Sequence, residues 1–198
     1  MPFIFSKCHK SISLKKIEPK INLKCPLIEH KNQILEYVKE NLPTWGIVKQ
    51  REDGYIYAEL PNYYIYDPYT LLNQNYAQLP NYFDENQPIG AHISLILPEE
   101  NPTNSIDIGE KIQFSIKDLH CSCPHNLPDI KYIWYLTVEC DTIVKIRKDN
   151  DLPAKIFNQE YHITFAIEKK VLNLEDIVAF NPFDQSLSIH PLNPFLGS

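Results

Sequence analysis

The chain has 198 residues, of which 43% are hydrophobic and 22% are charged. This composition is typical of a folded domain, and the length is sufficient for one compact unit with a sizeable core. The formal net charge is -6, and only two arginines occur, Arg51 and Arg147. The charge balance excludes a broad basic face, and with it a protein that coats extended duplex nucleic acid.

A few donors inside a cleft can still hold one phosphate, so a small nucleotide or the end of a short RNA strand fits as a partner. The 5 cysteines show no disulfide framework, which favours a reducing compartment. No apolar run has the length of a signal peptide or a membrane span. We therefore expect a cytoplasmic protein without a membrane partner. Its oligomeric state, and any unconventional export, cannot be inferred from the sequence.

The N-terminal part contains one predicted helix. Apolar positions recur at roughly helical spacing over Leu27–Leu42, and Pro43 ends the pattern. We interpret residues 1–44 as an N-terminal extension with a helix, and residues 45–198 as the main domain. The two parts are expected to pack as one unit.

A hairpin and a short helix are predicted next. The runs Ile47–Lys49 and Tyr55–Leu60 are rich in β-forming residues and are separated by the turn-forming triplet Glu52-Asp53-Gly54. Asp67-Pro68 is a residue pair typical of a helix start, so a helix is expected over Tyr69–Ala77.

The rest of the chain alternates strands and helices. Three short apolar runs predict strands at Ile89–Leu97, Lys111–Ile116 and Tyr132–Glu139. Two capped helices and a further strand are predicted at residues 142–148, 174–179 and 161–167. Strands separated by helices, without a regular βαβ repeat, indicate an α+β fold.

Two of the predicted strands each carry a histidine followed two positions later by a hydroxyl residue. The pairs are His92 with Ser94, and His162 with Thr164. Because side chains alternate along a strand, each pair shares one face while apolar neighbours occupy the other. Each strand therefore has one apolar and one reactive face.

This duplication suits the cleavage of a phosphodiester. One group must take a proton from the nucleophile and another must give one to the departing oxygen, and imidazole can do either near neutral pH. His92 and His162 are the candidate acid–base pair. Ser94 and Thr164 can donate hydrogen bonds to the non-bridging oxygens as charge develops. Such a mechanism needs no metal and no cofactor.

The tripeptide alone is a weak signal, because His9 and His120 are also followed by serine two positions on. Only His92 and His162 lie inside unbroken apolar strands. A purely structural interpretation, in which both are half-buried strand histidines, remains open from the pattern alone.

The order of the motifs and their surroundings resembles the 2H phosphoesterase superfamily, which includes cyclic phosphodiesterases acting on RNA ends. The run Pro80-Asn81-Tyr82-Phe83 precedes the first motif, and a Trp134–Glu139 strand and a capped helix with Arg147 precede the second. The resemblance covers roughly residues 45–180. Asp151-Leu152 departs from the glycine-leucine pair that members usually have, which affects a turn and not the chemistry.

This resemblance implies a pseudo-symmetric, two-lobed fold with antiparallel sheets and with His92 and His162 facing each other across a cleft. It implies a hydrolase that acts in RNA processing or on nucleotides. The substrate would be a 2′,3′-cyclic phosphate, a 2′–5′ linkage or a cyclic nucleotide. Tyr82, Trp134 and Tyr161 are candidates to contact a base or ribose.

Four alternatives remain. The same cleft can bind a nucleotide or an RNA end without turnover. A zinc site can form from the cluster His120–His125 with Cys140, although its spacing is tighter than usual and an ordinary polar loop is preferred. A cysteine nucleophile can pair Cys121 or Cys140 with His162. The tyrosine-rich segment 55–82 can serve as an interaction surface.

Overall fold

The computed structural model describes residues 24–80, 89–124 and 127–171. In chain order its elements are α1 (Lys31–Asn41), β1 (Trp45–Gln50), β2 (Ile56–Glu59), α2 (Tyr63–Leu72), β3 (His92–Ile96), the 3₁₀ turn η2 (Pro98–Glu100), β4 (Lys111–Gln113), β5 (Ser115–Ser122), β6 (Ile130–Glu139), α3 (Asp141–Asp149), the 3₁₀ turn η3 (Ile156–Asn158) and β7 (His162–Lys169). Within these residues no helix has the length and apolar character needed to cross a membrane.

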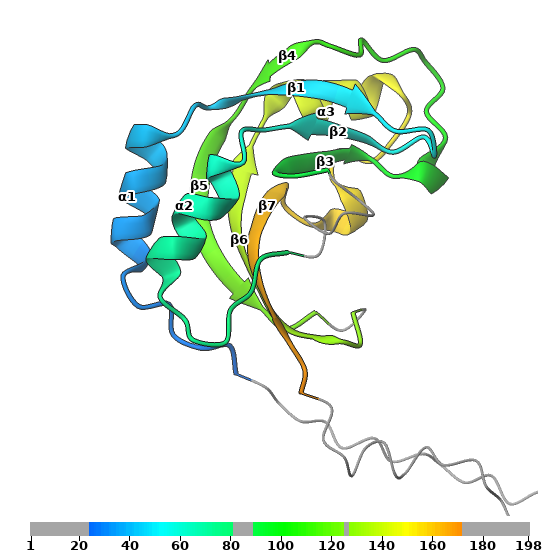
Figure 1. The fold of residues 1–198 in the computed structure, drawn as a ribbon. Helices are drawn as coiled ribbons and strands as arrows, with labels where there is room; N and C mark the ends of the chain where they lie inside the picture. Colours follow the sequence, from blue (N-terminus) through cyan, green and yellow to red (C-terminus); the bar gives the residue numbers. More distant parts are fainter. Residues whose placement is uncertain (1–23, 81–88, 125–126, 172–198) are drawn as a thin grey trace, which may run out of the picture.

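The strands form two antiparallel sheets. The first has the order β3-β2-β1-β4 and the second the order β5-β6-β7. The strands that begin with a motif histidine, β3 and β7, are edge strands of their sheets. These two edge strands contact each other (Figure 1). The α+β fold with two antiparallel sheets that the resemblance predicted is confirmed.

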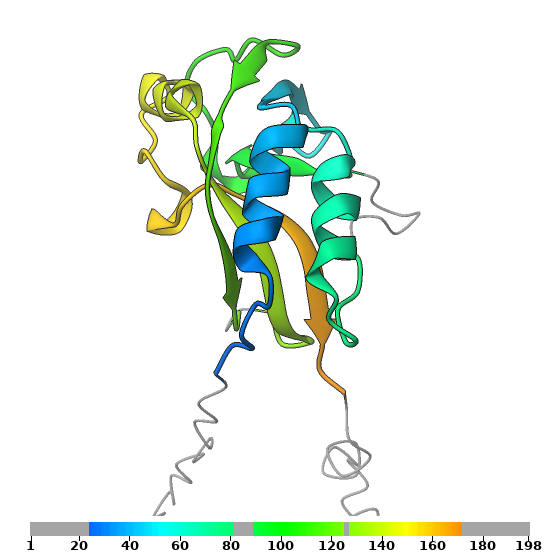
Figure 2. The same ribbon diagram turned by 90° about the vertical axis from the view of Figure 1, so that its left-hand side faces the viewer.

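Helices cover the apolar face of each sheet. α1 and α2 lie side by side and pack on the second sheet through β5 and β7 (Figure 2), whereas α3 packs on the first through β3 and β4. The covered faces carry alternate residues of the strands, such as Ile93 in β3 and Ile163 in β7, which have 0% exposed surface. The histidine motifs occupy the other positions of the alternation, so they point away from the helices.

The predicted helix at Tyr69–Ala77 is wrong in its position. The observed α2 begins six residues earlier and contains Pro68 in its interior. Proline lacks the N–H that the helix ladder needs, which costs about 3 kcal/mol. The cost is offset because three side chains of α2 are fully buried, each worth about 1.5–3 kcal/mol: Tyr64, Ile65 and Leu72. Tertiary burial, which the local pattern does not reveal, sets the start of this helix.

The predicted strand at Lys111–Ile116 is two strands. The chain leaves the first sheet after β4, passes through the buried Phe114 and enters the second sheet as β5. β5 continues to Ser122, so the first half of the cluster His120–His125 is strand and not the expected polar loop. The predicted hairpin and the other predicted strands are confirmed. The helices predicted over Leu27–Leu42 and 142–148 are also confirmed, as α1 and α3. The helix expected at 174–179 lies outside the described residues.

Candidate active site

The two motif histidines are held in the same way. His92 begins β3 and His162 begins β7. His92 Nδ1 lies 2.9 Å from the carbonyl oxygen of Gly90, and His162 Nδ1 lies 3.0 Å from that of Glu160. A carbonyl can only accept, so Nδ1 carries the hydrogen in both rings. The nitrogen that can exchange a proton with a bound substrate is therefore Nε2 in both.

The two histidines are also electrostatic neighbours. Burial of the His92 ring is the main cause that lowers its pKa below the usual range, and the nearby His162 lowers it further. The hydrogen bond to the Gly90 carbonyl acts in the opposite direction. At neutral pH the His92 ring is therefore neutral and can accept a proton.

Tyrosine rings border both imidazoles. The centroids of Tyr55 and Tyr57 lie 6.1 and 5.9 Å from that of His92, each edge-on. In the second sheet the Tyr135 ring lies 5.3 Å from that of His162, also edge-on. Edge-on aromatic pairs at this separation are favourable, so these rings restrict how each imidazole can turn.

The hydroxyls of the two motifs have different surroundings. Ser94 Oγ lies 2.6 Å from the hydroxyl oxygen of Tyr55, and either group can donate. Burial raises the pKa of Tyr55, so its phenol stays protonated at neutral pH. Thr164 lies opposite Tyr135 in the β6–β7 register and is partly buried. Tyr55 is a contact of the motif that the sequence interpretation did not identify.

A pocket joins residues from both motifs. Its volume is about 210 Å³, and its lining includes Ser94 from β3 and His162 from β7. Its lining also includes the apolar side chains of Leu97 and Phe157 and the carboxylate of Glu160. This volume is below the range of roughly 300–1,000 Å³ typical of pockets for drug-sized ligands, so the pocket fits part of a nucleotide.

Gly90 positions the first histidine and cannot be replaced without strain. Its φ is +70°, and a Cβ there would lie 2.5 Å from Asn62 Oδ1. That oxygen already accepts a hydrogen bond of 3.0 Å from the Ala91 N–H. Because the Gly90 carbonyl holds His92 Nδ1, the side chain of Asn62 fixes the backbone that orients the imidazole.

Gly90→Ala should therefore lower turnover by up to about 10²-fold, because a shift of the carbonyl misplaces His92 Nε2. Gly54→Ala is a matched control: Gly54 also has a positive φ, of +88°, but an added Cβ meets nothing within 4 Å. The comparison measures kcat for both variants at equal folded fraction by circular dichroism. An equal loss in both variants would show that backbone strain alone, and not the position of His92, is responsible.

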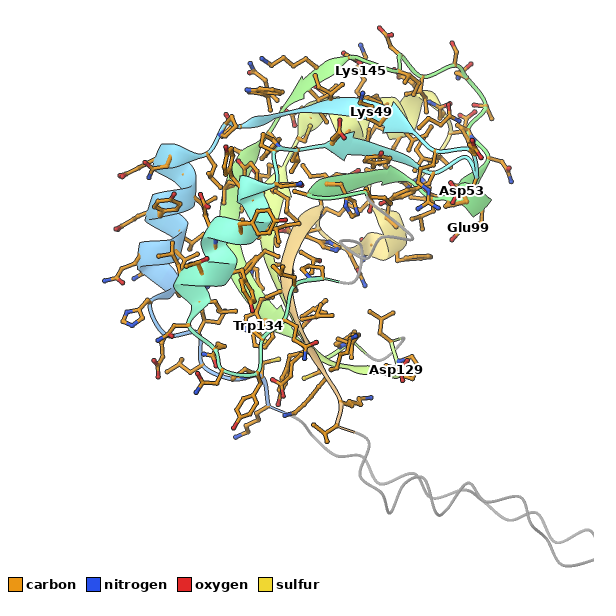
Figure 3. All side chains as sticks on the ribbon, in the orientation of Figure 1. Lys49, Asp53, Glu99, Asp129, Trp134 and Lys145 are labelled. Atoms are coloured by element: carbon orange, nitrogen blue, oxygen red, sulfur yellow. The ribbon has the colours of Figure 1, made fainter. Side chains whose placement is uncertain are left out.

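The three aromatic candidates for base contact are not equivalent. Trp134, labelled in Figure 3, has 1% exposed surface and packs against Tyr132 at a centroid distance of 6.0 Å. A ring buried in the core cannot stack on a ligand, which corrects that expectation. Tyr161 is part of the pocket lining, but only 6% of its surface is exposed. Because its hydroxyl donates to the Ala154 carbonyl, the residue forms a fixed part of that lining. Tyr82 lies outside the described residues.

The cysteine alternatives find little support in the geometry. Burial raises the pKa of both Cys121 and Cys140, which disfavours a nucleophilic thiolate. The Cys140 thiol donates to the Gln113 carbonyl at 3.1 Å. Across residues 24–80, 89–124 and 127–171, no group of three His, Cys, Asp or Glu side chains is arranged to hold a metal ion.

Two antiparallel sheets that meet at the strands beginning with His92 and His162 define an α+β protein. The family model of the Swiss Army Knife, 2H phosphoesterase domain, matches residues 54–172, more than half of the chain. The chain therefore belongs to the 2H phosphoesterase family, as the resemblance predicted, and this supports phosphodiesterase-type activity in general. Comparisons with curated proteins and with solved structures found no match.

Proposed function

We propose that this chain is a metal-independent phosphodiesterase that acts on cyclic or RNA-type phosphodiesters of nucleotides. The substrate classes are a 2′,3′-cyclic phosphate, a 2′–5′ linkage and a cyclic nucleotide. One observation carries the proposal: His92 and His162 begin contacting strands, and each has its Nδ1 on a backbone carbonyl. Two imidazoles held through the same nitrogen are suited to take one proton and give another through Nε2.

The surroundings of the two rings suggest their roles. The half-buried His92, whose pKa is lowered, is neutral and acts as the base that takes a proton from water. The oxygen of that water forms a bond to phosphorus, and the bond from phosphorus to the departing oxygen breaks. His162, as the acid, gives its Nε2 proton to that oxygen. The hydroxyls of Ser94 and Thr164 donate to the non-bridging oxygens, where charge builds up.

A substrate panel tests the proposal. The purified chain is assayed on 2′,3′-cyclic nucleotides, 2′–5′ dinucleotides and cyclic nucleotides, with and without EDTA. We expect turnover of at least one class at a rate that EDTA does not change, because the proton transfers come from histidine. Loss of activity with EDTA and rescue by zinc would contradict the mechanism. Nucleotide binding without any turnover would favour the alternative, a binding module that uses the same cleft.

The hydroxyl donors give a second prediction. Ser94→Ala and Thr164→Ala should each lower kcat by about 10²-fold with the fold intact, because each removes one donor to the developing charge. Ser115→Ala, at an exposed position of β5, serves as the control. The measurement is the single-turnover rate with saturating substrate for the parent and the three variants. If both motif variants match the parent, these hydroxyls do not contact the phosphate.

The pH profile gives a third prediction. The base must be neutral, so the rate should rise with pH as His92 loses its proton and fall again as the acid loses its own. Because burial lowers the pKa of His92, the acidic limb should have its midpoint below about 6.5, the ordinary value for histidine. The readout is kcat/KM against pH for the parent and for His92→Ala. An acidic limb that persists unchanged in His92→Ala would assign the base to another group.

A further inference from the structure

The loop that joins α3 to β7 carries an unusual aromatic residue beside the pocket. Phe157 lines the pocket together with Ser94 and His162, yet 76% of its surface is exposed. An exposed phenylalanine leaves a large apolar surface in water, although burial of such a side chain is among the strongest contributions to stability. Because the ring also lines the pocket, a ligand bound there can cover it.

The backbone at this residue is also unusual. Phe157 has a φ of 47° and Asn158 a φ of 60°, so two successive non-glycine residues adopt the left-handed conformation. For a bulky side chain this conformation is rare and costly. A glycine would relieve the cost but would remove the ring. The residue held in this conformation is an aromatic one that lines the pocket.

Both ends of the loop are fastened. The Tyr161 hydroxyl donates to the Ala154 carbonyl. The Glu160 carboxylate lies 3.2 Å from Lys117 Nζ and 3.6 Å from Lys155 Nζ. Two of these contacts join the two ends of the loop, and the third connects it to β5, so the loop that carries the ring is held beside His162. A fixed ring can contribute to ligand binding at a lower entropy cost than a mobile one.

We propose that the Phe157 ring is the platform on which the base of a nucleoside phosphodiester stacks while its phosphate lies at His162 and Ser94. The inference rests on the proposed function and adds that the nucleotide substrate is recognised through its base. Leu97 gives the pocket a further apolar wall, and the amide of Gln159 on the same lining can donate to and accept from the edge of a base. Phe157 takes the place of Trp134, whose ring is buried, as the aromatic contact.

The test compares two substrates that differ in the base: adenosine 2′,3′-cyclic phosphate and ribose 2′,3′-cyclic phosphate. Phe157→Ala should raise KM for the adenosine substrate by about 10- to 100-fold, the range expected for one lost base stack. Its kcat, and the kinetics with the ribose substrate, should change little. Phe157→Trp should keep the parent KM, because it retains a stacking surface. Tyr76→Ala, which removes another exposed ring (72%), is the control.

Calorimetric binding of adenosine 3′-monophosphate and of ribose phosphate separates failure of this inference from failure of the proposed function. If Phe157→Ala leaves both KM and Kd unchanged, the platform is wrong while the activity stands. If nothing is turned over but Phe157→Ala weakens only nucleotide binding, the platform stands and the catalytic proposal fails. Equal affinity of the parent for both ligands would also overturn the platform, as expected if the ring instead contacts another protein.

Discussion

His92→Ala and His162→Ala should each lower turnover of the cognate phosphodiester by about 10²–10⁴-fold, the usual contribution of a positioned acid or base. The reason is geometric. Each ring has its Nδ1 within hydrogen-bond distance of a carbonyl oxygen two residues earlier, so removing either imidazole removes the Nε2 that the proposal assigns to one of the two proton transfers. Substrate affinity should change far less than kcat, because proton transfer matters mainly in the transition state.

A third histidine supplies the control. His120 lies in β5 with its ring 5.7 Å from that of Tyr135, which in turn contacts His162. It is therefore an imidazole near the site that has no role in the proposed mechanism. His120→Ala should keep the parent kcat. A comparable loss in His120→Ala would mean that general disturbance of the second sheet, and not loss of an acid or base, lowers the rate.

Arg147→Met should lower the free energy of unfolding by about 3–5 kcal/mol, the cost of breaking a buried ion pair from one side. The Arg147 side chain has 0% exposure and forms two bonds of 2.6 and 2.9 Å with the Glu100 carboxylate. It also donates to the carbonyl oxygens of Leu95 at 2.6 Å and Pro153 at 2.7 Å. Methionine removes all of these donors, and Glu100 keeps only the hydrogen bond of 2.8 Å from the Leu97 N–H.

The control is a more exposed pair of similar length. Lys131 Nζ lies 2.7 Å from Glu168, and its side chain is 37% exposed. Lys131→Met should cost less than about 1 kcal/mol, because solvent screens such pairs. Urea unfolding of the parent and both variants gives the comparison. An equal decrease in the free energy of unfolding in the two variants would show that the burial of Arg147 does not make its ion pair more stabilising than an exposed one.

Arg147 also illustrates what the sequence can and cannot predict. The sequence contains two arginines, and one of them, Arg147, is used inside the fold. Its partner Glu100 is 47 residues away in the chain. Periodicity assigns a side chain to a face of its own helix or strand, but it does not say which distant element packs there.

The same limit explains the rest of the site. Strand periodicity placed His92 and His162 on reactive faces, because alternation is a local property. Asn62, which fixes the backbone at Gly90, and Tyr55, which contacts Ser94, come from other segments and left no local signal. The aromatic residue chosen by proximity to the motifs, Trp134, is in the core.

The most direct test is a single-turnover assay of four proteins on the cognate substrate: the parent, His92→Ala, His162→Ala and the double variant. Because both rings serve one step, the double substitution should cost clearly less than the product of the two single losses. Each single variant should already be strongly impaired. Full activity in either single variant, on a substrate that the parent cleaves, would contradict the two-histidine mechanism.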